Sequence, residues 1–371
     1  MRIGFDCTPI MPVRSGVGHY TEQLLHHLLK VRPEWEFLLY SNRVLNGETA
    51  RLAGARPVTG HFRPSRWLWM QARLPRVIHR SQPDLCHFPN NSAPLVHVRP
   101  YVVTIHDASL FLYSRFHPRS RLLALRLLLP RVARQAAAVI TVTQHARRDL
   151  VRVLGLAPEK VHVIGEAASA RFRPVSQDER QRLRRKYRLP SRFVFYAGTL
   201  EPRKNLGRLI QALGKLQEQG LEPHLILAGP NGWLGNGRLE AAIQEAGLTG
   251  RVRYLGYVPE ADLPGLYSLA TLFAFPSLYE GFGLPPLEAM ACGAPTLTSR
   301  GSAMAEVCQE AALLVDPRDV DEMAQGLARL WTDASLRGEL RERGFRQARK
   351  YSWEETARQT AALYERVHAC Q

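Results

Sequence analysis

The sequence has no long apolar segment, and this absence excludes one class of protein. Apolar runs such as Leu127–Leu129 are interrupted by neighbours such as Arg126 and Pro130. None approaches the roughly 20 residues that a bilayer-spanning helix needs. The first residues already form a strand pattern, so we expect no signal peptide and a cytoplasmic protein. With 45% hydrophobic and 22% charged residues, the composition is that of a folded chain rather than a disordered one.

Paired cysteines are also lacking. The sequence has five cysteines, an odd number, and no C-x-x-C pair. This disfavours both a disulfide framework and a cysteine-based zinc site, so we expect buried free thiols. The five are Cys7, Cys86, Cys292, Cys308 and Cys370. The D-x-D segment 319–321 opens a predicted helix, and we interpret it as a helix cap rather than a metal site.

Lysine is scarce, and the positive charge is unevenly distributed. Six lysines occur, so the basicity comes almost entirely from arginine. Residues 1–175 carry 25 Lys+Arg against 10 Asp+Glu, a net charge of +15, whereas residues 176–371 carry 25 against 23, a net charge of +2. A basic half attracts nucleic acid, an anionic membrane surface or a phosphorylated substrate. Genome composition would explain arginine in place of lysine, but not the asymmetry.

Short apolar strand patterns alternate with helical ones along the chain of 371 residues. Strands buried on both faces have such continuous apolar runs, and the alternation indicates parallel sheets. The fold class predicted is α/β, with two Rossmann-like, doubly wound domains. Predicted strands are 2–6, 36–40, 84–88, 101–105, 138–142 and 161–164, then 193–197, 224–228, 252–256, 272–275, 295–298 and 312–315. Predicted helices include 17–31, 65–80, 119–136, 144–154, 319–333, 336–350 and 353–369.

The two domains are expected to join near 166–192, where Pro174 and a polar stretch break the pattern. We predict a basic N-terminal domain over 1–172 and a C-terminal domain over 173–352. The helix in 353–371 is expected to pack back on the N-terminal domain. Ligands of open α/β sheets bind at the carboxyl ends of the strands. We therefore expect the site in a cleft between the two domains.

The segment 276–290 joins a strand to a helix through a glycine-bearing turn and carries two carboxylates, Glu280 and Glu288. Pro285 and Pro286 mark the helix start, where proline is well tolerated. The backbone N–H groups left for a phosphate or sugar oxygen belong to Phe282, Gly283 and Leu284. A pair of glutamates at this spacing is more often simply exposed to solvent. The hypothesis that this segment binds a ligand therefore depends on the residues that surround it.

That context is a basic loop about 75 residues upstream, where Arg203 and Lys204 follow a predicted strand and precede a helix. Side-chain cations and backbone amides at such a place can converge on a diphosphate. The alternative is a solvated basic turn. Because lysine is scarce, the presence of Lys204 here favours a function.

The N-terminal half has two further candidates. Gly16 and Gly18 lie in a turn before a helix, but the third glycine of a dinucleotide fingerprint is lacking, so NAD or FAD binding is poorly supported. His106 and Asp107 end a buried strand. A lone histidine is more often structural, but a polar pair at the carboxyl end of a strand facing a predicted site favours function.

Together these segments resemble the retaining glycosyltransferases of the GT-B fold, family 4 (glycosyl transferases group 1 type), whose two domains face each other across a cleft. The resemblance covers essentially the whole chain and is strongest over 193–316, in "GTLEPRKNL", "LGYV", "ATLFAFPSLYEGFGLPPLEAMACGAPTLTS" and "AALLVDP". It implies four catalytic residues, namely His106, Arg203, Lys204 and Glu280. It implies substrate-binding residues Gly16, Gly18, Asp107, Thr199, Tyr257, Val258, Phe282, Gly283, Leu284 and Glu288.

The sequence departs from the family pattern at two places. Thr199 occupies a position where many relatives carry arginine, so we expect the phosphate contacts to rest on the two cations of the basic loop alone. Segment 165–168, Gly-Glu-Ala-Ala, replaces a more usual Asn-Gly turn.

The resemblance implies transfer of a hexose or deoxyhexose, of mannose or rhamnose type, from a nucleotide-diphosphate sugar to a glycan acceptor. We expect the acceptor to be lipid-linked, the context to be bacterial surface polysaccharide or glycolipid synthesis, and the reaction to need no cofactor and no metal. Two alternatives stay open: a basic nucleic-acid-binding protein, although no such motif is present, and a GT-B isomerase or phosphorylase. We expect no nucleic-acid partner.

Two arginine-rich helical stretches, 65–80 and 119–136, bear on membrane association. The first interleaves arginines with Trp67, Trp69 and other apolar residues. One interpretation is amphipathic helices that pack on the sheet with solvated arginines. The other is that arginine and tryptophan hold the protein peripherally on an anionic membrane surface.

Overall fold

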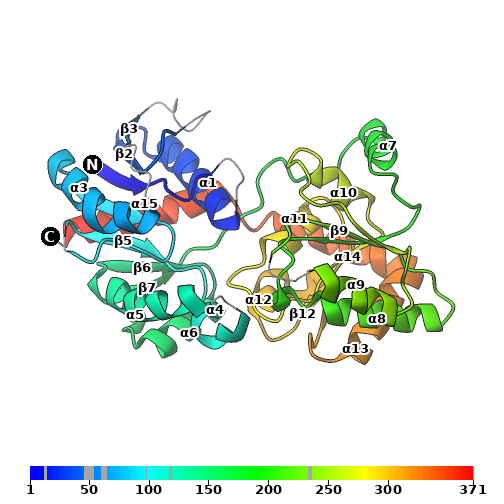
Figure 1. Cartoon of the computed structure of the whole chain (residues 1–371). Helices are drawn as coiled ribbons and strands as arrows, with labels where there is room; N and C mark the ends of the chain where they lie inside the picture. The colour runs from blue at the N-terminus through cyan, green and yellow to red at the C-terminus, as the bar shows by residue number, and fades with distance from the viewer. Residues whose placement is uncertain are drawn as a thin grey trace. The chain divides into compact units, whose positions relative to one another are not determined.

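The structure is a computed structural model that describes residues 1–11, 15–45, 54–59, 65–96, 98–116, 119–232 and 236–370. The chain forms two compact units (Figure 1). Unit 1 comprises Met1–Glu166 and Ser352–Gln371, and unit 2 comprises Ala167–Tyr351. The last helix therefore belongs with the N-terminal part of the chain, and the first crossing between the units follows Glu166.

The described residues of unit 1 form a seven-stranded parallel sheet in the order β3-β2-β1-β4-β5-β6-β7. Its strands are β1 (Arg2–Asp6), β2 (Glu36–Ser41), β3 (Ala55–Thr59), β4 (Leu85–Phe88), β5 (Tyr101–Thr104), β6 (Ala138–Thr141) and β7 (Val161–Val163). Its α-helices are α1 (Gly16–Val31), α2 (Arg66–Leu68), α3 (Leu74–Ser81), α4 (Ser109–Leu112), α5 (Arg119–Gln135), α6 (Gln144–Leu154) and α15 (Trp353–Ala369), with short helical turns η2 (Trp69–Arg73), η3 (Ser114–Phe116) and η4 (Pro158–Lys160).

The described residues of unit 2 form a six-stranded parallel sheet in the order β10-β9-β8-β11-β12-β13. Its strands are β8 (Val194–Ala197), β9 (Leu225–Ala228), β10 (Val252–Tyr254), β11 (Leu272–Phe275), β12 (Thr296–Ser299) and β13 (Ala312–Val315). Its α-helices are α7 (Gln177–Lys186), α8 (Leu206–Glu218), α9 (Asn236–Glu245), α10 (Leu263–Leu269), α11 (Leu284–Ala291), α12 (Ala303–Cys308), α13 (Val320–Thr332) and α14 (Ala334–Ala348), with 3-10 turns η5 (Pro202–Lys204) and η6 (Gln309–Ala311).

The α/β fold class predicted from the sequence is confirmed, and every predicted strand is present within two residues of its expected bounds. Strand β3 was not predicted. It contains Pro57, which lacks a backbone N–H, and it lies at the edge of its sheet, where a proline is tolerated. The single helix predicted over 65–80 is wrong in detail, because a π-helical turn interrupts it and Pro75 lies in the first turn of α3.

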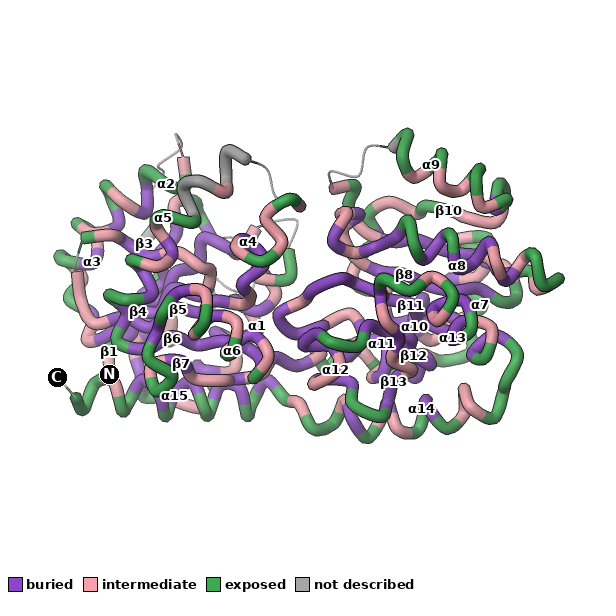
Figure 2. Tube along the Cα trace, turned by 90° about the horizontal axis from the view of Figure 1, so that it is seen from below, coloured by how far each residue is buried: buried purple, intermediate pink, exposed green. Residues whose placement is uncertain are grey.

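The core of each unit is formed by strands that are buried along nearly their whole length, as Figure 2 shows by colour. Helices cover both faces of the sheets, which is why these strands have continuous apolar sequences instead of an alternating pattern. In unit 1, α15 packs against α1, and the rings of Trp35 and Tyr364 stack with their centroids 6.2 Å apart. These contacts fasten the end of the chain to the N-terminal sheet.

Each sheet has a point at which the strand order reverses, and loops on either side of such a point diverge to leave a binding crevice. In unit 1 this point lies between β1 and β4, and in unit 2 it lies between β8 and β11. The loop after β8 contains Arg203 and Lys204, and the loop after β11 contains Glu280. The topology therefore brings together two sequence motifs that are about 75 residues apart.

Across the described part of the chain, no helix combines the length and the apolar character that crossing a bilayer requires. The described cysteines are all free thiols, as expected. The expectation that they are buried holds for four of them and is wrong for Cys370, which is exposed near the end of the chain.

The close approach of two loops in unit 2 can be tested at Gly229. Its φ is +134°, and a Cβ there would lie 2.2 Å from the Gly198 carbonyl oxygen. We expect Gly229→Ala to lower the free energy of unfolding by about 3 kcal/mol. Gly220 has φ +78° but no described neighbour within 4 Å, so Gly220→Ala should cost about 1 kcal/mol. Urea denaturation measures both, and equal losses would contradict the close approach.

Candidate functional site

A cluster of charged side chains lies at the reversal point of the unit 2 sheet. Lys204 Nζ donates to Glu280 Oε1 at 2.7 Å, and an Arg203 guanidinium nitrogen lies 3.0 Å from the same oxygen. The Ser277 hydroxyl donates to Oε1 as well, at 2.6 Å. The three charged side chains are only 10 to 13% exposed. The structure thus brings together three residues that the sequence singled out, and adds Ser277.

Backbone contacts fix the geometry of this cluster. The Leu278 N–H donates to the Arg203 carbonyl at 2.9 Å, and Arg203 donates to the Tyr279 carbonyl. Asn205 has a left-handed backbone with φ +66°, and its side-chain amide donates to the carbonyls of Pro276 and Pro317. Because the Asn205 side chain satisfies two buried carbonyls, it fixes the loop after β8 against the loops after β11 and β13.

The hydrogen bonds to Glu280 from described residues all reach Oε1. The second oxygen, Oε2, accepts none from the described part of the chain. A carboxylate has about four lone-pair sites, and two of them are on Oε2. Glu280 therefore keeps acceptor capacity for a ligand while its other oxygen is held by the protein.

Electrostatics keep the cluster charged. Burial alone would raise the pKa of Glu280, but the charges of Arg203 and Lys204 and the hydrogen bonds lower it to about 2. Burial lowers the pKa of Lys204, and the charge of Glu280 offsets part of that effect. Glu201 lies 3.6 Å from Arg203 and balances the second cation. The two cations and two carboxylates thus carry no net charge. Each buried cation remains charged because a carboxylate lies beside it.

The turn after Glu280 leads into α11. Gly283 precedes the helix with φ +110°, and none of the described side chains caps the helix start. Phe282 is buried and makes an edge-to-face contact with Tyr351, while Leu284 is half-buried. One turn into the helix, Glu288 accepts a hydrogen bond from the Tyr267 hydroxyl at 3.0 Å.

Three strand ends of unit 2 converge beside this cluster through glycines. The Gly229 N–H donates to the Gly256 carbonyl at 2.8 Å, and the Gly198 N–H donates to the Ala228 carbonyl at 2.9 Å. Three predicted ligand-binding residues belong to the loops after these strands. Thr199 is half-buried, Tyr257 is 52% exposed and Val258 is buried. Tyr257 is the aromatic residue of the three, and it is exposed.

In unit 1, the predicted glycine turn forms the start of α1. Ser15 caps the helix by accepting from the Gly18 N–H at 3.3 Å. Gly16 is exposed and Gly18 is buried. A helix of 16 residues carries a partial positive charge at its N-terminus, which here lies at Gly16.

His106 and Asp107 follow β5, and the structure gives them different surroundings. The Asp107 carboxylate accepts from the Ser109 N–H at 2.8 Å and so shapes the turn into α4. His106 is held through both ring nitrogens, with Nδ1 2.9 Å from Glu166 Oε1 and Nε2 3.0 Å from the Pro89 carbonyl. Sequence reasoning noted Glu166 only as a departure from the family pattern, so its partnership with His106 was missed.

The predicted site residues fall into two groups, each within one unit. Unit 1 holds Gly16, Gly18, His106 and Asp107, whereas unit 2 holds the others. The expectation that both groups serve one cleft stays a prediction. Besides Glu166, sequence reasoning missed Ser277, Asn205 and Tyr267. Ser277 lies within the segment 276–290 and Asn205 within "GTLEPRKNL", so their place in the two motifs was the signal that could have identified them.

The arginine-rich stretch of unit 1 is divided between core and surface. Trp67 and Leu68 are 55% and 40% exposed, whereas Trp69 and Met70 are buried. In the second stretch, Leu127 is 69% exposed. Part of the apolar sequence there is thus core, and part remains on the surface.

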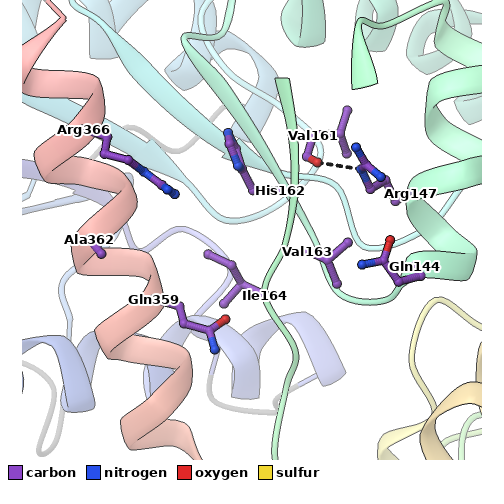
Figure 3. A pocket seen from close by; sticks show the side chains of 9 residues that line it. All are labelled: Gln144, Arg147, Val161, His162, Val163, Ile164, Gln359, Ala362 and Arg366. Atoms are coloured by element: carbon purple, nitrogen blue, oxygen red, sulfur yellow. Dashed lines mark hydrogen bonds between the residues drawn. The ribbon is translucent and has the colours of Figure 1, made fainter. Parts of the chain in front are cut away.

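Unit 1 also has a hollow of about 390 Å³ beside its edge strand β7, between α6 and α15 (Figure 3). Part of its polar lining is engaged within the protein. Arg147 donates to the carbonyls of Val161 and Pro158, and Gln359 donates to Glu355. The hollow contains no residue of the predicted site.

The described residues contain no group of three or more His, Cys, Asp or Glu side chains that could hold a metal ion. The D-x-D segment forms a helix cap, in line with the sequence-based interpretation, because Asp319 accepts from the N–H groups of Asp321 and Glu322. Asp321 itself pairs with Lys215 on the surface.

Two parallel sheets, each with one reversal of strand order, match the GT-B fold of solved glycosyltransferase structures. Sequence comparison agrees for both units. Residues 14–167 match the family described as Glycosyltransferase Family 4, and residues 179–350 match Glycosyl transferases group 1. The chain belongs to this family of glycosyltransferases.

Individual relatives match over the full length. The chain is 32% identical to the O-antigen chain mannosyltransferase B of Escherichia coli, covering 98% of this chain and 99% of that protein. Sucrose-phosphate synthase from Thermosynechococcus elongatus has a similar structure, with a TM-score of 0.80 at 20% identity over 100% of both chains. HepE of Anabaena in complex with UDP-glucose gives a TM-score of 0.77 at 21% identity, over 98% of this chain and 99% of that one.

The charged cluster makes a stability prediction. Glu280→Gln leaves two buried cations with less compensation, so we expect the free energy of unfolding to fall by about 3 kcal/mol. Glu342→Gln is the control, since Glu342 is exposed on α14, and it should change stability by less than about 0.5 kcal/mol. Urea denaturation at pH 7 measures both. A Glu280→Gln protein as stable as the control would show that the cations do not depend on this carboxylate.

Proposed function

We propose that this protein transfers a hexose, with mannose favoured over rhamnose, from a nucleotide-diphosphate sugar to a glycan acceptor. The family membership establishes glycosyl transfer. The full-length similarity to an O-antigen chain mannosyltransferase supports mannose as the sugar and surface polysaccharide synthesis as the context. The neighbour solved with UDP-glucose supports a nucleotide sugar as the donor.

The observation that carries the proposal is the contact of Lys204 and Arg203 with Glu280. Cleaving a sugar–diphosphate bond builds negative charge on the departing phosphate and positive charge on the sugar. Cations fixed beforehand stabilise the first charge without reorganisation during the reaction. The carboxylate keeps one oxygen for the sugar hydroxyls, which places sugar and phosphate recognition at one point of the sheet.

The remaining predicted residues would complete the donor site. Gly283 and Leu284 would offer backbone N–H groups to the sugar and phosphate, Glu288 would accept from the ribose hydroxyls, and Tyr257 would lie beside the base. In unit 1, the N-terminus of α1 at Gly16 would approach the diphosphate, and His106 would lie near the reacting sugar.

We infer a retaining, same-face reaction. The bond from the sugar C1 to the diphosphate oxygen breaks, and the acceptor hydroxyl oxygen forms the new C1 bond on the same face. The hydroxyl proton passes to the departing phosphate oxygen. Arg203 and Lys204 neutralise the diphosphate throughout, so this route needs neither a metal nor a nucleophile from the protein.

A lipid-linked acceptor would account for the basic character of residues 1–175. The exposed Trp67 and Leu68, together with arginines on the same helical segment, would lie against an anionic membrane surface. Peripheral binding of this kind would bring the enzyme to a lipid-linked glycan at the inner face of the membrane.

Removing one cation tests the site. Lys204→Ala should lower kcat by about a hundredfold to a thousandfold, because a fixed charge that stabilises the leaving group is lost. Lys215→Ala is the matched control, since Lys215 belongs to the same unit but is a surface residue that pairs with Asp321. Turnover is measured with the donor, among GDP-, UDP- and dTDP-sugars, that raises the thermal midpoint most.

Equal turnover of the two lysine variants would remove Lys204 from the mechanism. Steep, salt-dependent binding to random DNA, with no response to any nucleotide sugar, would favour a nucleic-acid-binding function instead.

The metal requirement is a separate prediction. If Arg203 and Lys204 supply the positive charge, excess EDTA should leave the initial rate within about twofold of the untreated enzyme. Loss of activity that is restored by added Mg²⁺ or Mn²⁺ would contradict a metal-independent reaction.

A further inference from the structure

His106 lies between two acceptor groups of the protein. Its Nε2 is 3.0 Å from the Pro89 carbonyl oxygen, and its Nδ1 is 2.9 Å from Glu166 Oε1. A carbonyl oxygen only accepts, so Nε2 carries a proton and donates it. The state of Nδ1 then decides the charge of the ring. If Glu166 is a carboxylate, Nδ1 must also carry a proton, and the ring is an imidazolium.

The surroundings favour the charged ring. Burial alone would lower the pKa of His106, but the hydrogen bond and the charge of Glu166 outweigh it and hold the pKa above its ordinary value. The Glu166 side chain is only 6% exposed, and Asp107 adds a second negative charge from the same strand end. Tyr20 of α1 meets the ring edge-to-face at 4.7 Å and leaves both nitrogens to their acceptors.

The other buried histidine nearby shows the opposite state. His87 on β4 faces two hydroxyls, with Nε2 2.8 Å from Thr104 Oγ1 and Nδ1 bonded to the Tyr364 hydroxyl of α15. Burial and the charge of His106 lower the pKa of His87 to about 3. Two histidines in one polar network thus differ in charge, because only one of them has a carboxylate partner.

We propose that Glu166 is a positioning residue that keeps His106 as an imidazolium held by two protein acceptors. His106 then contributes a fixed positive charge at the carboxyl end of β5 and neither takes up nor releases a proton during the reaction. The catalytic part of this inference rests on the proposed function, in which His106 lies near the reacting sugar. Its structural part rests on unit 1 alone.

The pair formed by Glu166 and His106 also fixes the chain where it leaves unit 1. Glu166 is the last residue of unit 1 before the chain passes to unit 2. The charge-assisted hydrogen bond therefore ties the exit of the chain to the end of β5, and Thr356 of α15 secures the same exit by donating to the Gly165 carbonyl at 2.8 Å. Such bonds to ionised partners are about twice as strong as neutral ones.

Glu166→Gln tests the proposal, because glutamine keeps the size and can donate to a neutral Nδ1. ¹⁵N-histidine NMR of the full chain at pH 7.5 should show a doubly protonated His106 ring in the unaltered protein and a neutral ring, protonated on Nε2, in the variant. The His106 signals are assigned by their loss in His106→Asn. At pH 5 a solvent-exposed histidine is charged, whereas burial keeps the His87 ring neutral, so a neutral His87 signature at pH 5 in both proteins shows that the variant is folded. A neutral His106 ring in the unaltered protein would overturn the proposal.

The pH profile of kcat distinguishes an electrostatic role of the His106 charge from a purely structural role of its contact with Glu166. A histidine is charged below its pKa, so a raised pKa preserves the imidazolium to higher pH, and the variant loses it at lower pH. We expect the kcat of Glu166→Gln to lie about tenfold below that of the unaltered enzyme at pH 7.5 and to approach it as the pH falls toward 5. Glu159→Gln, at an exposed glutamate of unit 1, should follow the unaltered profile.

A Glu166→Gln profile parallel to that of the unaltered enzyme would overturn the catalytic part, because a structural defect lowers kcat equally at each pH. If the ring charges differ as expected but neither protein transfers sugar from any donor, the assignment of Glu166 stands and the proposed function fails.

Discussion

The contact between Glu280 and the two cations Arg203 and Lys204 is the interaction on which the functional site depends. Each partner would be costly to bury alone, and together they remain charged in a nearly enclosed place. The loops after β8 and β11 carry these residues because the strand order reverses between those strands. Sheet topology thus decides where the charge cluster forms, and the cluster in turn fixes the conformation of both loops.

The same contact gives the site its chemical character. Glu280 holds the cations through one oxygen, and in the proposed function its other oxygen would accept from sugar hydroxyls, so that a single carboxylate would link recognition of hydroxyls to recognition of phosphate. Tight glycine contacts, such as that between Gly198 and Gly229, let neighbouring strand ends approach closely beside it. A sugar nucleotide has hydroxyls, a diphosphate and a base in one molecule, and unit 2 has groups suited to each of them.

Unit 1 illustrates how environment determines the state of identical side chains. His87 and His106 belong to one network of buried polar groups that also includes Thr104 and Tyr20. Burial and the charge of His106 lower the pKa of His87, whereas the carboxylate of Glu166 raises the pKa of His106 and favours its charged form. A charged ring with both nitrogens engaged is suited to electrostatic stabilisation rather than to proton transfer.

The sequence by itself determined the two sheets, nearly all of the strands and the two motifs of unit 2, because buried strands and β–α turns have local patterns. It could not predict β3, since Pro57 and the polar residues beside it do not resemble a strand. Nor could it show that Trp69 is core while Trp67 is exposed, since both lie in one helical stretch. The partners of His106, Ser277 and Asn205 were decided only by the tertiary structure. Hydrogen bonds such as that between Asn205 and Pro317, which are 112 positions apart, depend on how strands are ordered in a sheet, and no local pattern encodes that order.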